Sequence, residues 1–106
     1  MYAIHLEADS CQLDRSQINF GELAHVIPRV SGCRVEHMCA AELPHSRHMG
    51  VVFVSADSIV AAGAAVLQAV RYLLKDSGSR ARPELRAPAV GGQHGLCHGV
   101  VSVRAG

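Results

Sequence analysis

The longest regular pattern of apolar residues lies between residues 58 and 75, where the spacing alternates between three and four. Its apolar positions are Ile59, Gly63, Val66, Val70 and Leu73, widened by Leu67 and Leu74. Residues spaced in this way share one side of an α-helix, and the many Ala and Leu residues favour helix formation. Asp57 or Ser58 can cap the first turn. The pattern predicts a long helix that the rest of the chain packs around.

A second helical pattern covers residues 19–30, with Phe20, Leu23, Ile27 and Val30 on one side. Asn19 followed by Glu22 resembles a capping box. Pro28 removes one helical hydrogen bond and clashes with the preceding turn. We therefore expect this helix to end near Val26 or to kink there.

Period-two alternation of apolar and polar residues predicts strands over 2–8 and 33–43. In the second of these, alternation puts Val35, His37 and Cys39 on one face and Arg34, Glu36, Met38 and Ala40 on the other. Residues 50–55 form a continuous β-branched and aromatic run, which is typical of a central strand. A short last strand is expected over 99–104. Residues 77–92 contain two prolines and Gly91-Gly92 without a clear period, which predicts a long, mobile surface loop.

This order of elements is satisfied by an α+β sandwich of the ferredoxin-like βαββαβ type. Two helices would cover one face of a four-stranded antiparallel sheet. A chain of 106 residues is expected to form a single domain over 1–106 and can bury a core without disulfides.

The second face of such a sheet needs either polar residues or a partner. Depending on the register, its candidates are Ala3, His5, Val35 or Met38, Val52 or Val54, and Val101 or Ser102. Either set holds more apolar residues than a solvated face needs, and Ala61, Ala64 and Ala65 add small residues on the outer side of the long helix. We therefore expect a homo-oligomer or a protein partner. The competing explanation is that the loop 77–92 folds back over this face.

Composition excludes several classes of function. Hydrophobic residues make up 49% and charged residues 18% of the chain, with a net charge of +1 when histidine is neutral. This charge gives no global field that would attract nucleic acid or an anionic membrane. We find no apolar run of membrane-spanning length and no secretory signal, so we expect a cytoplasmic protein without membrane contact.

Seven histidines and four cysteines are the side chains most able to carry chemistry. They gather partly in clusters, whose members are His37 and Cys39, His45 and His48, and His94, Cys97 and His98. Imidazole and thiolate are the ligands that zinc prefers, yet none of these spacings matches a known zinc signature. We therefore expect no cofactor, with a zinc site at these residues as the alternative. In a reducing compartment the cysteines, Cys11 and Cys33 included, are expected to be free and small buried thiols.

A nucleophilic site would need a thiol or hydroxyl beside a histidine. Only His37 and Cys39 are expected to share a face, and the sequence has none of the common nucleophile or phosphate-loop motifs. Residues 1–6 and 50–54 resemble the two strand motifs of the RNA-recognition motif family, which stack bases on aromatic side chains. However, valine occupies one of the aromatic positions, and aromatic residues make up 4% of the chain. RNA binding therefore ranks below the other functions.

Two functions remain. The first is a small non-catalytic binding or assembly module that self-associates, or binds a protein partner, through its open sheet face. The second is a small enzyme, or a metal or small-ligand binder, that uses the loops bearing histidine and cysteine.

Overall fold

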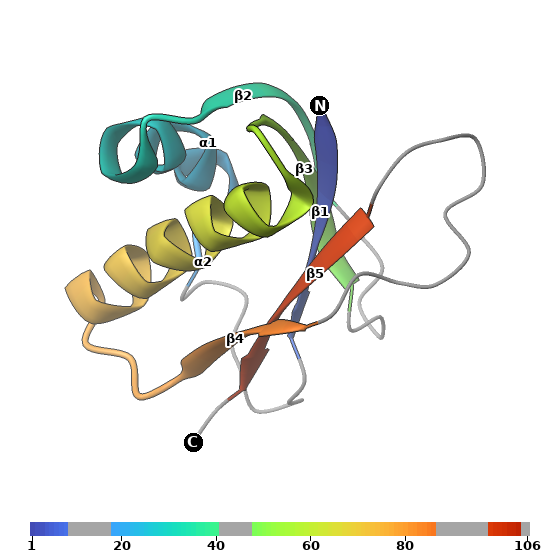
Figure 1. The fold of residues 1–106 in the computed structure, drawn as a ribbon. Coiled ribbons are helices and arrows are strands. Elements are labelled where there is room, and N and C mark those ends of the chain that lie inside the picture. Colours follow the sequence, from blue (N-terminus) through green and yellow to red (C-terminus); the bar gives the residue numbers. More distant parts are fainter. Residues whose placement is uncertain (9–17, 41–47, 87–97, 105–106) are drawn as a thin grey trace.

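The computed structural model describes residues 1–8, 18–40, 48–86 and 98–104 of the chain. These residues form an α+β structure in which two helices pack on one face of a mixed sheet (Figure 1). In chain order the elements are β1 (Tyr2–Ala8), α1 (Phe20–Ser31), β2 (Arg34–Ala40), β3 (His48–Ser55), α2 (Ile59–Asp76), β4 (Arg82–Arg86) and β5 (His98–Arg104).

The described sheet has five strands in the order β2-β3-β1-β5-β4. β3 runs antiparallel to both β1 and β2, and β4 runs antiparallel to β5. β5 is parallel to β1. The expected four-stranded antiparallel ferredoxin-like sheet is therefore wrong in its last part, although the elements from β1 to α2 follow the expected order. β4 has the direction expected of the final strand, but β5 is inserted between it and β1.

The region expected to be a long loop contains this extra strand. β4 occupies residues 82–86, and its position at the edge of the sheet lets it pair along one side only. Pro83 cannot donate a hydrogen bond to a neighbouring strand, so it suits an edge position. Residues 87–92 lie outside the described part of the chain. Because 82–86 belongs to the sheet, this half of the segment cannot fold back over the sheet face.

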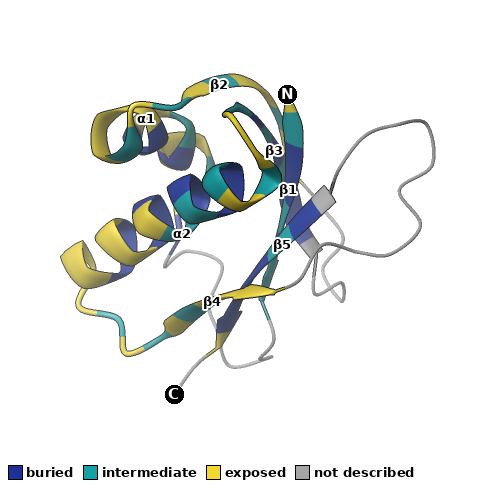
Figure 2. Cartoon of the chain, viewed as in Figure 1, coloured by how far each residue is buried: buried dark blue, intermediate teal, exposed yellow. Residues whose placement is uncertain are grey.

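α2 forms as its apolar spacing predicts. The Ser58 side chain accepts a hydrogen bond from the backbone N–H of Ala61 at 3.1 Å and so caps the helix. Its buried residues include most of the predicted stripe, namely Gly63, Val66, Val70, Leu73 and Leu74. Figure 2 shows this buried side turned toward the sheet and the exposed side turned outward. The placement of Ala65 on the outer side is wrong, because this residue is 2% exposed and belongs to the core.

α1 runs through Pro28 to Ser31 and does not end near Val26. The Asn19 side chain accepts a hydrogen bond from the Glu22 N–H at 3.0 Å, which caps the first turn. At the other end Gly32 has a φ of 76°, a left-handed conformation that costs glycine little, and its N–H donates to the carbonyl of Pro28. Burial of Leu23, Val26 and Ile27 adds tertiary support, which offsets the hydrogen bond lost at proline.

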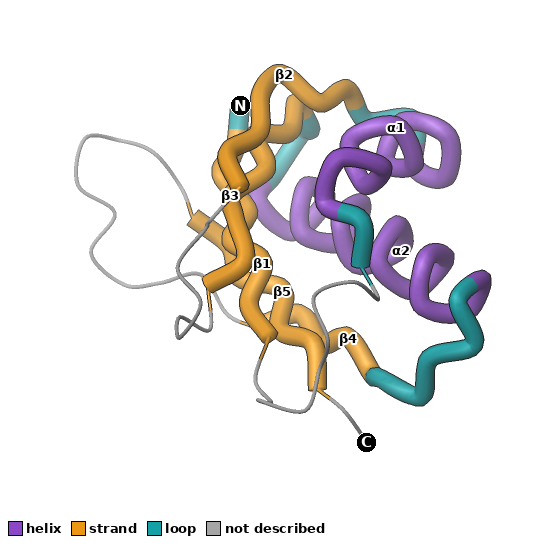
Figure 3. Tube along the Cα trace, turned by 180° about the vertical axis from the view of Figure 1, so that it is seen from behind, coloured by secondary structure: helices purple, strands orange, loops and turns teal. Residues whose placement is uncertain are grey.

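The two faces of the sheet differ in what lies over them. In Figure 3 both helices lie on the same side of the strands, and none of the described segments lies over the opposite side. The side toward the helices carries the core, including Ile4, Leu6, Val52, Val54, Val101 and Val103. We call the opposite side the open face.

A β-bulge in β2 changes which residues share a face. Val35 and His37 pair with Val54 and Phe53, which are consecutive in β3, so Glu36 is an extra residue in β2. The strict alternation that the sequence predicts for β2 is therefore wrong. Val35 and Met38 share the helix side with their partners, whereas His37 and Cys39 lie on the open face together with Arg34 and Glu36.

Candidate functional site

The centre of the open face is an apolar and aromatic surface contributed by three neighbouring strands. Strand pairing places His5 of β1 between Val51 of β3 and Val100 of β5, and Ala3 beside Phe53. Ala3 is fully buried, whereas the other four side chains are half-buried. We call these five residues the central patch. They take the place of Val35, Met38, Val52, Val54 and Val101, the sequence-based candidates that the structure puts on the helix side.

A thiol and an imidazole meet at the β2 margin of the open face. The Cys39 Sγ lies 3.1 Å from His37 Nε2, and both side chains are exposed. The His37 ring also packs on Phe53, with ring centroids 5.6 Å apart. The predicted shared face of these two residues is therefore confirmed. The prediction that the cysteines are small buried thiols is wrong for Cys39, whose thiol is free and exposed, whereas the free thiol of Cys33 is half-buried.

Next to this pair, the bulge residue Glu36 is held by two neighbours. Its Oε1 accepts hydrogen bonds from Ser55 Oγ at 2.8 Å and from Arg34 Nε at 2.9 Å. The Ser55 hydrogen bond, followed by that from Arg34, lowers the pKa of the Glu36 carboxyl below its ordinary value. Because Ser55 belongs to β3, this contact links the edge strand to its neighbour.

Removing the Ser55 hydroxyl should raise the pKa of Glu36 toward its ordinary value. A lowered pKa in the folded state contributes stability that is present above the unfolded-state pKa and lost as the pH falls through the folded-state value. Ser55→Ala should therefore lose less stability than the wild type over that acid range. An NMR titration of the Glu36 carboxyl measures the pKa directly, with Ser77→Ala as the control. A Glu36 pKa that is the same in Ser55→Ala and the wild type would contradict this assignment.

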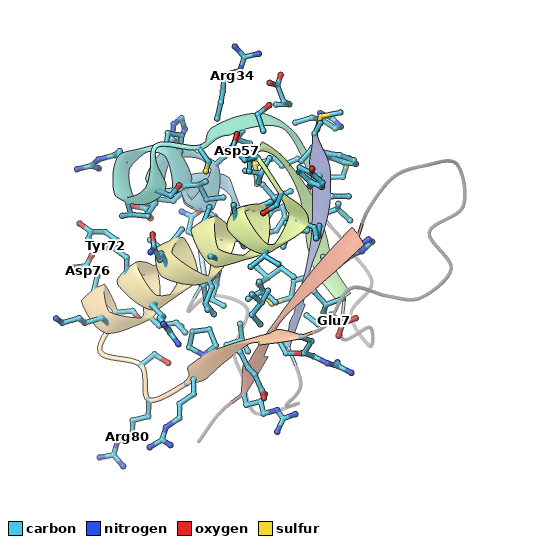
Figure 4. The ribbon with its side chains drawn as sticks, in the orientation of Figure 1. Glu7, Arg34, Asp57, Tyr72, Asp76 and Arg80 are labelled. Carbon is cyan, nitrogen blue, oxygen red and sulfur yellow. The ribbon has the colours of Figure 1, made fainter. Side chains whose placement is uncertain are left out.

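The opposite margin of the open face is charged. Arg86 Nη1 lies 3.2 Å from Glu7 Oε2, and Arg104 Nε lies 3.5 Å from Glu84 Oε2. Between them Ser102 is 1% exposed, and its Oγ has no hydrogen-bond partner among the described residues. In Figure 4, Arg34 projects outward at the β2 end of the sheet, whereas Glu7 lies near β4 and β5. The open face thus combines an apolar centre with margins that carry both signs of charge.

The described part of the structure does not bring the remaining predicted site residues together. His45, His94 and Cys97 lie outside the described residues. His48 begins β3 and His98 begins β5, where its backbone pairs with Ala3, but their side chains are not described. Within the described ranges no three His, Cys, Asp or Glu side chains gather closely enough to hold a metal ion.

Sequence reasoning missed Val51, Phe53 and Val100 as open-face residues. All three stand in apolar runs in which neighbours on both faces are hydrophobic, so alternation gave no signal for the register. The usable signal was Gly50, because a glycine inside a strand can mark a close approach by another element. Here the approaching element is α1, whose Phe20 ring packs over Gly50 and thereby fixes that side of β3 toward the helices.

A shallow hollow on the helix side is the other surface feature of note. Val26, Arg29 and Val30 of α1 and Tyr72 of α2 line it. Tyr72 is 48% exposed and Val30 37%, so both side chains contribute to the surface of this hollow. Arg29 is the one charged residue among these four lining residues, and they do not form a group of polar side chains that point toward one another. The hollow is therefore a weaker candidate site than the open face.

No family model, curated protein or solved structure matches this chain. Neither described helix combines the length and apolar character needed to cross a lipid bilayer. Function must therefore be argued from the surfaces themselves.

Proposed function

We propose that this chain is a small, non-catalytic assembly module that associates with a second copy of itself through the open face. The observation that carries the proposal is the asymmetry of the sheet, which has two helices on one side and the half-buried central patch on the other. Apolar surface exposed beside a sheet core is stabilised when another surface excludes water from it. A sheet face over which none of the described segments lies supports docking more directly than it supports catalysis.

The margins of the face favour a second copy as the occupant. The β2 margin carries Arg34 and Glu36, and the far margin carries Glu7, Glu84 and three arginines, Arg82, Arg86 and Arg104. A two-fold axis parallel to the strands would place each margin over the opposite margin of the other copy, so that both signs of charge face one another across the interface. Closed two-fold symmetry is also the commonest arrangement of homo-oligomers. A different protein on the same face is the alternative occupant.

We also propose a cytoplasmic location, which the free thiols of Cys33 and Cys39 support. RNA binding stays below the other functions because Tyr2, the aromatic residue of the first strand motif, packs against the core instead of the open face. A small enzyme or metal binder remains the second candidate, and the contact between Cys39 and His37 is the specific observation that favours it.

Val100→Lys should weaken the association by about 5- to 150-fold, because burying an unpaired polar group costs about 1–3 kcal/mol. Arg86 lies opposite Val100 in the sheet, so the new ammonium faces a like charge. Val60→Lys is the matched control, since Val60 is 67% exposed on the helix side. Light scattering after size exclusion measures the mass of each variant, and circular dichroism verifies folding. Equal masses for folded Val100→Lys and Val60→Lys would contradict docking through the open face.

A further inference from the structure

We propose that the outer edge of β2 carries half of a zinc site, which a second copy of this chain completes. Each copy would supply the Cys39 thiolate and the His37 imidazole, and the joined edges would hold one zinc ion in a Cys₂His₂ environment. This inference uses the strand edge and not the central patch, so it goes beyond the proposed function and can fail separately from it.

The two donor atoms already converge within one chain. His37 and Cys39 are two residues apart on one strand, which puts them on the same face, and their Nε2 and Sγ atoms lie 3.1 Å apart. Ligand bonds of about 2.3 Å from sulfur and about 2.0 Å from nitrogen at tetrahedral angles need a separation of roughly 3.5 Å. A small rotation of either exposed side chain supplies the difference.

One chain supplies two donors, whereas a structural zinc site takes four. Within the described ranges no third His, Cys, Asp or Glu completes the pair. The missing donors must therefore come from outside this part of the chain. The geometry of β2 indicates a second copy as their source.

β2 is an edge strand of the described sheet, so its outer backbone groups can pair with another strand. After the bulge, residues 37–40 pair with β3 in an unbroken register. At the other edge, β4 carries Pro83 and three charged residues, which are features that discourage strand pairing. β2 is thus the edge better suited to accept a second strand.

Two-fold symmetry brings the donors together in one particular register. If two β2 strands pair antiparallel with Met38 opposite its own copy, each His37 lies opposite the other copy's Cys39. Side chains directly opposite one another have Cβ atoms about 4.5–5.5 Å apart and lie on the same face of the sheet. All four donors then surround one point at the seam between the two sheets.

The chemistry of these donors suits zinc. Each Cys39 thiol releases its proton to the solvent on binding, and each neutral imidazole contributes its Nε2 lone pair. Two thiolates balance the charge of Zn²⁺, so the completed site carries no net charge. Thiolate and imidazole together favour zinc over calcium and magnesium, which prefer oxygen ligands.

The test is a zinc titration of the reduced, chelator-treated full chain, followed by sedimentation. The expected result is one zinc per two chains with a twofold rise over the mass measured without metal. Cobalt(II) in place of zinc should give the intense visible absorption of a tetrahedral thiolate site. His37→Ala and Cys39→Ser should each abolish the rise in mass, whereas the controls His25→Ala and Cys33→Ser should keep it.

Three results would overturn the inference. They are one zinc per chain without a change in mass, zinc-dependent doubling that survives both His37→Ala and Cys39→Ser, and no zinc binding at all. Val100→Lys separates this site from the open face, because Val100 lies in β5, beyond β3 and β1 from the donors. Zinc should still double the mass of that variant, even where the metal-free association is lost.

Discussion

Val70→Asp should lower the free energy of unfolding by about 3–5 kcal/mol, the cost of leaving a charge buried without a partner. Val70 is fully buried in α2 within the cluster that joins both helices to the sheet. No basic side chain belongs to this cluster of buried residues, so the new carboxylate would have none beside it there. Since small domains are stable by about 5–15 kcal/mol, this loss would consume a large share of the total.

Chemical denaturation measures this effect, with Gln68→Asp as the matched control. Gln68 lies two residues away on the exposed side of the same helix, so its replacement introduces the same charge into solvent. The control should change the free energy of unfolding by less than about 0.5 kcal/mol. Equal unfolding free energies for the two variants would mean that α2 does not bury the predicted stripe.

Gly50→Ala should destabilise the chain by about 1–3 kcal/mol through overpacking. A Cβ atom at Gly50 would lie 2.6 Å from the backbone carbonyl oxygen of Cys39 and would also overlap the Phe20 ring. The ring can move, but the carbonyl belongs to the strand paired with Gly50 and can shift only if β2 shifts. The variant therefore tests how α1, β2 and β3 pack together.

Gly21→Ala is the control for Gly50→Ala. At this helical position the nearest atom to a new Cβ is Asn19 Oδ1 at 3.5 Å, an ordinary contact. Alanine is favoured over glycine within a helix by about 0.8–1.0 kcal/mol, so this variant should be at least as stable as the wild type. Thermal unfolding measures the melting temperature of both variants. Equal melting temperatures for Gly50→Ala and Gly21→Ala would contradict the close approach of α1 to β3.

The parts of the fold that could be predicted are those in which one periodic pattern dominates. The 3–4 spacing of α2 and the alternation in residues 2–8 each mark one apolar side of an element. Both sides are buried in the folded chain, so both elements form as predicted. β4 was missed because Arg82–Arg86 contains a proline, three charges and one leucine. An edge strand of this kind buries little and leaves no apolar pattern. Because β4 precedes β5 and the two strands run antiparallel, β5 runs parallel to β1. This direction could not be predicted without knowing that β4 is a strand.

The candidate site was predictable only where it did not depend on the register. His37 and Cys39 are two residues apart with no bulge between them, so they share a face in either register of the strand. To name the residues of the central patch, one must know which side of β3 faces the helices. The packing of Phe20 over Gly50 determines that side. The bulge residue Glu36 accepts hydrogen bonds from Ser55 and Arg34, and the sequence pattern of β2 contains no signal for the bulge.

Sedimentation equilibrium of the metal-free wild-type chain tests the central claim, association of two copies through the open face. The chain has a mass of 11.2 kDa, so we expect an average mass that rises toward twice this value as the protein concentration reaches tens of micromolar. Chelator in the buffer keeps any zinc-dependent pairing out of the measurement. A mass that stays at 11.2 kDa over the whole concentration range would contradict self-association.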